Sequence, residues 1–254
     1  MFGSLIVEEL RDEYNVVAAT REILDLSNHN MVAAFALNAY AFICAAGPFQ
    51  TLDPAIVRLV VGMGAHWLDI SDDRRWYFGL MDDLSLNELA INRNLCVVSG
   101  LSSLPAISCA LARRLMPPHA DITLFIGNDN AKGAAAIASC ATLDTPDAWI
   151  LHHELNMEAT VRAKFEMPGV QVALATLRML PPRARIRAAK ILARLAPRFG
   201  KQGGYVEVNG VRIEMTQRRA ILPVAYAMRQ LDRMWGCFGP TAFDHEELLA
   251  FIQQ

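Results

Sequence analysis

The first half of the chain alternates short apolar runs with segments of helical periodicity, and this alternation limits the folds that it can adopt. The apolar runs predict β-strands over residues 15–20, 40–46, 66–70 and 95–99, with a further strand over 23–26 left open. Helical patterns cover residues 2–13, 30–38, 54–62, 73–92 and 106–115. Strands buried on both faces read as continuous apolar runs, and parallel strands need crossovers between them. We therefore predict an α/β fold with a parallel, Rossmann-like sheet covered by helices on both faces.

The pattern changes after the double proline Pro117-Pro118. Strands are then predicted over residues 121–126 and 157–166, and helices over 131–141, 181–198 and 222–234. Two alternating runs, 205–208 and 211–214, flank Asn209-Gly210. This arrangement predicts a β-hairpin because both residues of such a turn must adopt positive φ. An antiparallel hairpin after a parallel sheet indicates a second domain of α/β (α+β) type.

These patterns predict a two-domain organisation. We expect residues 1–117 to form a truncated, Rossmann-like dinucleotide-binding domain, and residues 118–235 to form a substrate or dimerisation domain that contains the hairpin. We expect residues 236–254 to form a C-terminal tail that packs back on the first domain. Asp244 is the predicted cap of a last helix in this tail.

Composition argues against several classes of partner. Lys and Arg total 24 and Asp and Glu total 26, so the net charge of −2 gives no electrostatic case for a nucleic-acid partner. The five cysteines are scattered without a Cys-x-x-Cys pair, which favours reduced thiols in a cytoplasmic protein. Residues 31–52 carry no charge, but Asn38, Gly47, Pro48 and Gln50 interrupt them, so a membrane span is not expected.

The predicted strand over residues 15–20 runs into Arg21. In a dinucleotide-binding fold the second strand ends beside the adenine ribose of the cofactor. An acidic residue there suits the 2′-hydroxyl of NAD, whereas an arginine suits the 2′-phosphate of NADP. Arg21 therefore favours NADP if a dinucleotide binds. The competing interpretation is an ordinary exposed arginine at a strand end.

Three further strand ends carry residues suited to a ligand. The segment Ala46-Gly47-Pro48-Phe49 follows a strand of small residues and lets a ligand approach the backbone; the competing interpretation is a plain turn. Asp69 is a candidate hydrogen-bond acceptor, unless it serves as a cap for the residues after it. Ser102 and Ser103 follow the next strand. Open α/β sheets bind ligands at the carboxyl ends of their strands, so all three segments are site candidates.

Taken in order, these segments resemble the saccharopine dehydrogenase-like oxidoreductase family. The matching stretches include Ala45-Ala46-Gly47-Pro48-Phe49, Gly64-x-His66-x-x-Asp69, Ser99-Gly100-x-Ser102-Ser103-x-Pro105, Gly127-Asn128-x-x-x-Lys132-Gly133 and Trp235-Gly236-Cys237-Phe238-Gly239. Each stretch is loose, but their order follows the family over nearly the whole chain. The resemblance implies NAD(P)-dependent oxidoreduction of a small molecule.

The resemblance also assigns residues to the site. It implies an NADP or NAD site formed by Gly3, Arg21, Ala46, Gly47, Pro48, Phe49 and Asp69. It implies a substrate site formed by Ser102, Ser103, Asn128 and Lys132, with no metal. The family's second domain further implies a homodimer. No residue is singled out as a catalytic acid or base.

The chain departs from the family at the phosphate-binding loop. The family opens with a strand and a Gly-x-Gly-x-x-Gly loop, whereas this chain matches only the end of that loop, at Gly3. No crossover helix follows Arg21, and Lys132 replaces an arginine. We therefore expect weak dinucleotide binding, with a dissociation constant above roughly 1 mM. The alternative is a non-catalytic remnant or interaction protein that keeps the fold, and a third interpretation is a start codon further upstream.

Overall fold

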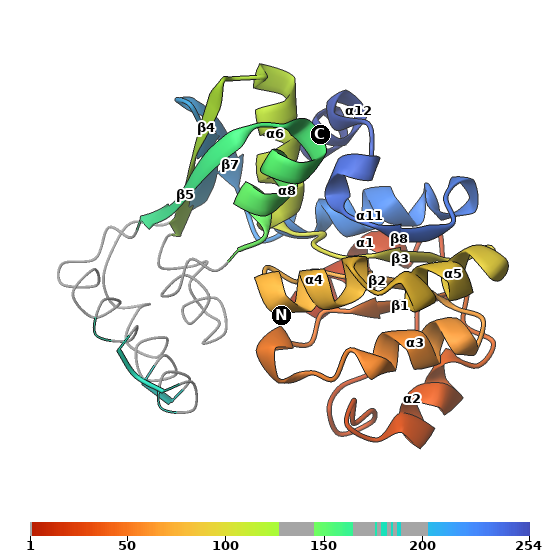
Figure 1. The fold of residues 1–254 in the computed structure, drawn as a ribbon. Helices are drawn as coiled ribbons and strands as arrows, with labels where there is room; N and C mark the ends of the chain where they lie inside the picture. Colours follow the sequence, from red (N-terminus) through yellow and green to blue (C-terminus); the bar gives the residue numbers. More distant parts are fainter. Residues whose placement is uncertain are drawn as a thin grey trace.

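The computed structural model describes residues 2–126, 145–164 and 203–254, with isolated positions between 176 and 188. Two four-stranded sheets organise this part of the chain (Figure 1). Sheet A has the strand order β1-β2-β3-β8, and sheet B has the order β5-β4-β6-β7. The strands are β1 (Ala41–Cys44), β2 (His66–Asp69), β3 (Cys96–Val98), β4 (His119–Ile126), β5 (Glu158–Lys164), β6 (Gly204–Val208), β7 (Val211–Met215) and β8 (Gly236–Phe238).

Helices occupy most of the connections between these strands. The α-helices are α1 (Phe2–Leu10), α2 (His29–Ala36), α3 (Ala55–Gly62), α4 (Arg74–Met81), α5 (Leu84–Asn92), α6 (Ser108–Leu115), α8 (Asp147–Leu155), α11 (Leu222–Met228) and α12 (His245–Ile252). Shorter helical turns include η1 (Phe49–Thr51), η2 (Ser103–Ile107) and η6 (Pro240–Ala242). No helix within the described ranges is both long and apolar enough to cross a membrane.

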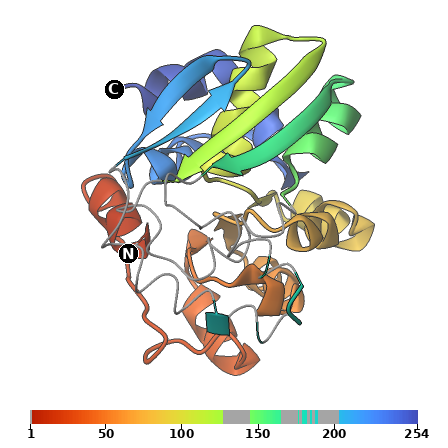
Figure 2. The same ribbon diagram turned by 90° about the vertical axis from the view of Figure 1, so that its left-hand side faces the viewer.

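Sheet A is parallel throughout and is covered on both faces. Figures 1 and 2 show α1 on one face and α4 and α5 on the other. Neighbouring residues of a strand point to opposite faces. Trp67 and Val97 accordingly pack in a cluster with residues of α3 and α5, whereas Leu68 and Val98 pack in a cluster with residues of α1. The predicted α/β class with a parallel sheet is confirmed.

Sheet B is mixed. Strand β4 pairs in parallel with β5 and antiparallel with β6, and β6 pairs antiparallel with β7. The predicted hairpin is confirmed, since Val208 pairs with Val211 across a turn in which Asn209 has φ 49° and Gly210 has φ 85°. Asn209 also fixes the turn to β4, because its side chain accepts from the N–H of Asp121 at 2.8 Å.

The last part of the chain returns to sheet A. Strand β8 adds to the edge of β3, and the side-chain oxygen of Asn87 on α5 accepts from the N–H of Cys237 at 2.8 Å. Helix α12 then packs against α6 and α11. As predicted, Asp244 caps α12, with its carboxylate accepting from the N–H of Glu247 at 2.9 Å.

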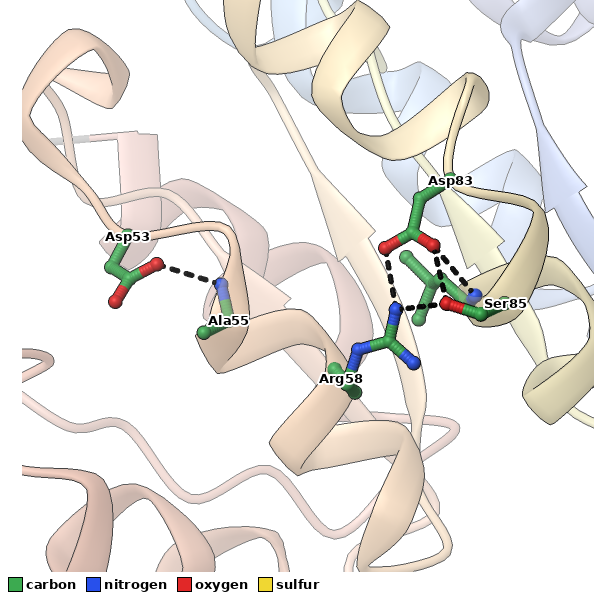
Figure 3. A network of polar contacts seen from close by, with 6 residues as sticks. Asp53, Ala55, Arg58, Asp83 and Ser85 are labelled. Carbon is green, nitrogen blue, oxygen red and sulfur yellow. Dashed lines mark hydrogen bonds and ion pairs between the residues drawn. The ribbon is translucent and has the colours of Figure 1, made fainter.

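One predicted helix, over residues 73–92, is divided into α4 and α5. Asp83 ends the run because its carboxylate caps α5, accepting from the N–H of Leu86 at 3.0 Å. Figure 3 shows Arg58 of α3 joined to this cap, donating to Asp83 Oδ2 at 2.6 Å and to Ser85 Oγ at 2.7 Å. Asp53 accepts from the N–H of Ala55 at 2.9 Å at the start of α3. The Asp83 carboxylate thus sets where α5 begins.

The strand predicted over residues 15–20 is wrong, and the strand left open over residues 23–26 does not form. Residues 15–20 have no regular secondary structure, and residues 21–23 form a turn in which the carbonyl of Thr20 accepts from the N–H groups of Ile23 and Leu24. Val17 is 74% exposed. An apolar run becomes a strand where a neighbouring strand pairs with it; among the described residues no strand pairs with this run, although Val16 packs against the core.

Helix α8 begins with a carboxylate that is removed from water. Asp147 is fully buried, and its Oδ1 accepts a hydrogen bond from the hydroxyl of Ser108 on α6. Burial raises the pKa of Asp147 from its ordinary value of 3.8 to about 6, although the Ser108 hydrogen bond opposes the rise. The folded protein therefore binds a proton at Asp147 more tightly than the unfolded chain does.

This binding difference predicts a pH dependence of stability. Between about pH 4 and pH 6 the folded state holds the proton of Asp147 and the unfolded state loses it, so the free energy of unfolding falls as the pH rises. The full loss is about 3 kcal/mol, from 1.36 kcal/mol per pKa unit. Urea unfolding of the wild type and of Asp147→Asn at pH 4.5 and 7.5 measures it. We expect Asp147→Asn to gain stability relative to the wild type at the higher pH; a difference that does not change with pH contradicts the raised pKa.

Candidate functional site

The carboxyl ends of the parallel strands bring four loops to one edge of sheet A. They are residues 45–48 after β1, 70–73 after β2, 99–102 after β3 and 239–241 after β8. Ligands of open α/β sheets bind outside this edge. The predicted site residues Ala46, Gly47, Pro48 and Ser102 lie in two of these loops, and Phe49, Asp69 and Ser103 directly adjoin three of them.

The N-terminus of α1 lies against the loop after β1. A Cβ atom placed on Gly3 would be 3.9 Å from the Cβ atom of Ala45, which is van der Waals contact. The following residues Ala46 and Gly47 are exposed, and the Gly47-Pro48 peptide bond is cis. The structure thus brings Gly3 together with the predicted turn and leaves the backbone of that turn accessible to solvent.

Phe49 turns inward from the same loop. It is 7% exposed, and its ring lies 5.4 Å from that of Trp76, measured between centroids. Trp76 belongs to α4, so this contact ties the loop after β1 to the helix after β2. Phe49 therefore anchors the turn in the core, while Ala46 and Gly47 form the solvent-accessible surface of the turn.

Asp69 lies at the end of β2 with no exposed surface. Its Oδ1 accepts from Ser99 Oγ at 2.8 Å, from the N–H of Ser71 at 3.0 Å and from the N–H of Gly100 at 3.2 Å. Its Oδ2 accepts from the indole N–H groups of Trp67 and Trp76, each at 2.9 Å. Burial raises the pKa of Asp69, and these hydrogen bonds oppose the rise. A ligand would reach this carboxylate only by displacing one of five internal donors.

The loop after β3 carries Ser102 and Ser103. It turns at Gly100, which has φ 86°, and a Cβ atom there would lie 2.8 Å from Cγ of Pro105. This position therefore requires glycine both for its backbone conformation and for the close approach of the proline. Ser102 and Ser103 are half-buried, and the Ser102 hydroxyl donates to the carbonyl of Leu104 at 2.5 Å. The other two predicted substrate residues, Asn128 and Lys132, lie outside the described residues.

Arg21 lies on the turn that replaces the predicted strand end, and it is exposed. Its charge acts on the carboxylates of Glu22 and Asp25 in the same segment. The geometry that motivated its assignment, a strand leading to the adenine ribose, is therefore absent from the described residues. Its positive charge remains available to an anionic ligand.

Sequence reasoning missed a polar contact between the two halves of the chain. Tyr77 of α4 is fully buried, and its hydroxyl donates to Glu154 Oε1 of α8 at 3.4 Å. The hydroxyl of Thr241 donates to the other carboxylate oxygen of Glu154. A Cβ atom on Gly239 would collide with the Tyr77 hydroxyl, so glycine at this position lets the hydroxyl approach. No local signal could reveal this group, since its members come from three distant segments.

Glu154 is solvent-exposed as a whole residue, but its carboxyl group lies against the buried hydroxyl of Tyr77. Desolvation raises the pKa of Glu154 above its ordinary value, and the Tyr77 hydrogen bond opposes that rise. The pKa of Tyr77 is also raised, first by burial and then by the charge of Glu154. Across the described ranges, no group of three or more His, Cys, Asp or Glu side chains is arranged to hold a metal ion.

No protein-family model matches the chain, and no curated protein matches it significantly. Of the family resemblance, the structure supports the α/β fold with a parallel sheet.

The Asp69 network predicts a large effect of a small substitution. Asp69→Asn replaces one acceptor oxygen by an amide N–H₂ group that faces N–H or O–H donors. We expect a loss of about 3 kcal/mol or more in the free energy of unfolding, measured with urea. Asp53→Asn is the control, because asparagine can keep the exposed cap on Ala55 and we expect a change below about 0.5 kcal/mol. Equal effects of the two substitutions would contradict a structural role for the buried carboxylate.

Proposed function

We propose that this chain is an NAD(P)-dependent oxidoreductase of the saccharopine dehydrogenase-like type, acting on a small molecule with NADP as the preferred cofactor. One observation carries the proposal: the N-terminus of α1, at Gly3, lies against Ala45 at the carboxyl end of β1 in a parallel sheet. Helix N-termini at this edge offer N–H groups and partial positive charge to a pyrophosphate. The bound cofactor would supply the hydride chemistry, and the protein would supply binding and orientation.

The residues at this edge fit such a cofactor in part. The exposed backbone of Ala46 and Gly47 permits close approach of a ligand, and Ser102 and Ser103 supply hydroxyl groups after β3, on the far side of β2 from β1. Arg21 supplies a planar cation suited to the 2′-phosphate of NADP. Asp69 contributes by holding the loops, since its carboxylate is already saturated by internal donors.

A second candidate function is that of an interaction protein that keeps the fold without the cofactor. Two observations favour it. The acidic residue assigned to cofactor binding is wholly buried, and Arg21 sits on a turn instead of at a strand end. Binding of the cofactor distinguishes the two candidates.

A charge change at Gly3 tests the phosphate site. Gly3→Asp places a carboxylate in the first turn of α1. There its charge stabilises the helix through the helix dipole but repels a pyrophosphate. We expect NADPH to bind the 254-residue wild type with millimolar affinity and Gly3→Asp to lose binding without losing stability. Saturation-transfer NMR detects binding in this range. Gly3→Asn, of the same size but uncharged, is the matched control and should lose less.

The outcomes separate the two candidates. Binding of NADPH that Gly3→Asp abolishes supports the oxidoreductase. Absence of NADPH and NADH binding to the wild type at several millimolar supports the interaction protein. Binding that responds equally to Gly3→Asp and Gly3→Asn contradicts a phosphate site at this helix.

Cofactor preference is a separate prediction. We expect NADP(H) to bind more tightly than NAD(H), and Arg21→Ala to weaken NADP(H) by about tenfold while leaving NAD(H) unchanged, because only the 2′-phosphate loses a partner. Competition between the two reduced cofactors in the same NMR measurement tests this. Equal loss for both cofactors, or preference for NAD(H), contradicts the role of Arg21.

A further inference from the structure

A cavity of about 420 Å³ lies between α4, α8 and the turn that follows β8. Sites for small molecules have volumes of roughly 300–1,000 Å³, so this cavity can hold a small organic ligand. The residues that line it are Met81, Asp82, Arg113, Trp149, Glu154, Leu155, Cys237, Phe238, Gly239, Thr241 and Ala242. They come from both halves of the chain, and the cofactor site proposed above uses none of them.

Two helices end at this cavity. Met81 and Asp82 mark the C-terminus of α4, and Glu154 and Leu155 belong to the last turn of α8. The last carbonyl groups of a helix lack intrahelical donors and carry a partial negative charge. Two such termini at one cavity create a negative potential, which stabilises a cation.

Two carboxylates add to that potential. Asp82 is exposed at the rim, and Glu154 accepts one hydrogen bond on each oxygen, from Tyr77 and from Thr241. A carboxylate accepts about four hydrogen bonds, so Glu154 keeps capacity for a ligand. Neither carboxylate has an ion-pair partner among the residues that the structure describes.

The one basic residue of the lining is already engaged. Arg113 donates from its Nη1 to the carbonyl of Thr241 at 2.9 Å and to that of Phe243 at 3.5 Å. Its charge also acts on the nearby carboxylate of Asp244. Arg113 is therefore held by two backbone acceptors, and its positive charge offsets part of the negative charge of Asp82 and Glu154 in the lining.

Trp149 and Phe238 supply an apolar wall. Trp149 is held in place on α8, with its ring 4.6 Å from that of Phe78 and 4.4 Å from that of His153, between centroids. The indole is therefore fixed before a ligand arrives, which lowers the entropic cost of binding. A carbon chain can lie along this wall with its charged end toward the carboxylates.

We propose that this cavity binds a small organic molecule carrying a protonated amine, with the ammonium group at the carboxylates of Asp82 and Glu154 and the carbon skeleton against Trp149. The ammonium group would donate to the last carbonyl groups of the two helices, to Asp82 and to the remaining lone pairs of Glu154. This site works independently of the cofactor, so its test needs no dinucleotide.

Three probes with the same four-carbon chain test the sign of the charge. Butylamine, 1-butanol and butyrate are titrated into the ¹⁵N-labelled full chain at pH 7, and the indole N–H resonance of Trp149 is followed. Trp149→Phe identifies that resonance. We expect butylamine to bind roughly threefold to tenfold more tightly than 1-butanol, and butyrate to bind most weakly. Raised salt should weaken only butylamine, because screening acts on its charge.

Charge-removing variants locate the ammonium group. Asp82→Asn and Glu154→Gln should each weaken butylamine about threefold or more and leave 1-butanol unchanged. Glu88→Gln removes an exposed carboxylate of α5 outside the cavity and is the matched control. If butyrate bound more tightly than butylamine, the result would overturn the proposal and indicate an anion site at Arg113. Equal affinity for butylamine and 1-butanol, or no binding of any probe at several tens of millimolar, would overturn it as well.

Discussion

The buried carboxylate of Asp69 holds the carboxyl end of sheet A together. A charge removed from water is tolerated only where hydrogen-bond donors replace the solvent, and here five donors surround it. They come from β2, from the loops after β2 and β3, and from α4, so one acceptor fixes the ends of two strands and a helix. Trp76 links this group to Phe49, and so to the turn after β1 that faces Gly3.

The two sheets also share a buried hydrophobic core. Leu68 and Val98 of sheet A belong to the same buried cluster as Ile122 and Val206 of sheet B. The contact of Glu154 with Tyr77 and the cavity beside it lie where these two halves meet. A ligand in the cavity would therefore contact the boundary between the two sheets. A dinucleotide would instead contact the loops at the carboxyl ends of the strands of sheet A, which Asp69 holds together.

Local patterns were enough to predict the architecture. The short runs over 66–70 and 95–99 were predicted as strands from their mostly apolar residues, and β2 and β3 occupy the middle of a parallel sheet. The hairpin followed from Asn209-Gly210, because its turn demands positive φ at both residues. Of the predicted site, the turn at Gly47-Pro48, Asp69 and the serines after β3 were correctly located at strand ends.

The sequence by itself determined which segments could be strands, turns and capped helices, since these depend on residues a few positions apart. Tertiary structure decided which apolar runs found a partner: the run over residues 15–20 did not, whereas β8 joined β3 from the far end of the chain. It also decided that Asp69 would accept hydrogen bonds from indole groups, and that Glu154 would accept one from Tyr77 at the boundary between the two sheets. Such contacts join residues far apart in sequence, and only the packed core brings their side chains within hydrogen-bonding distance.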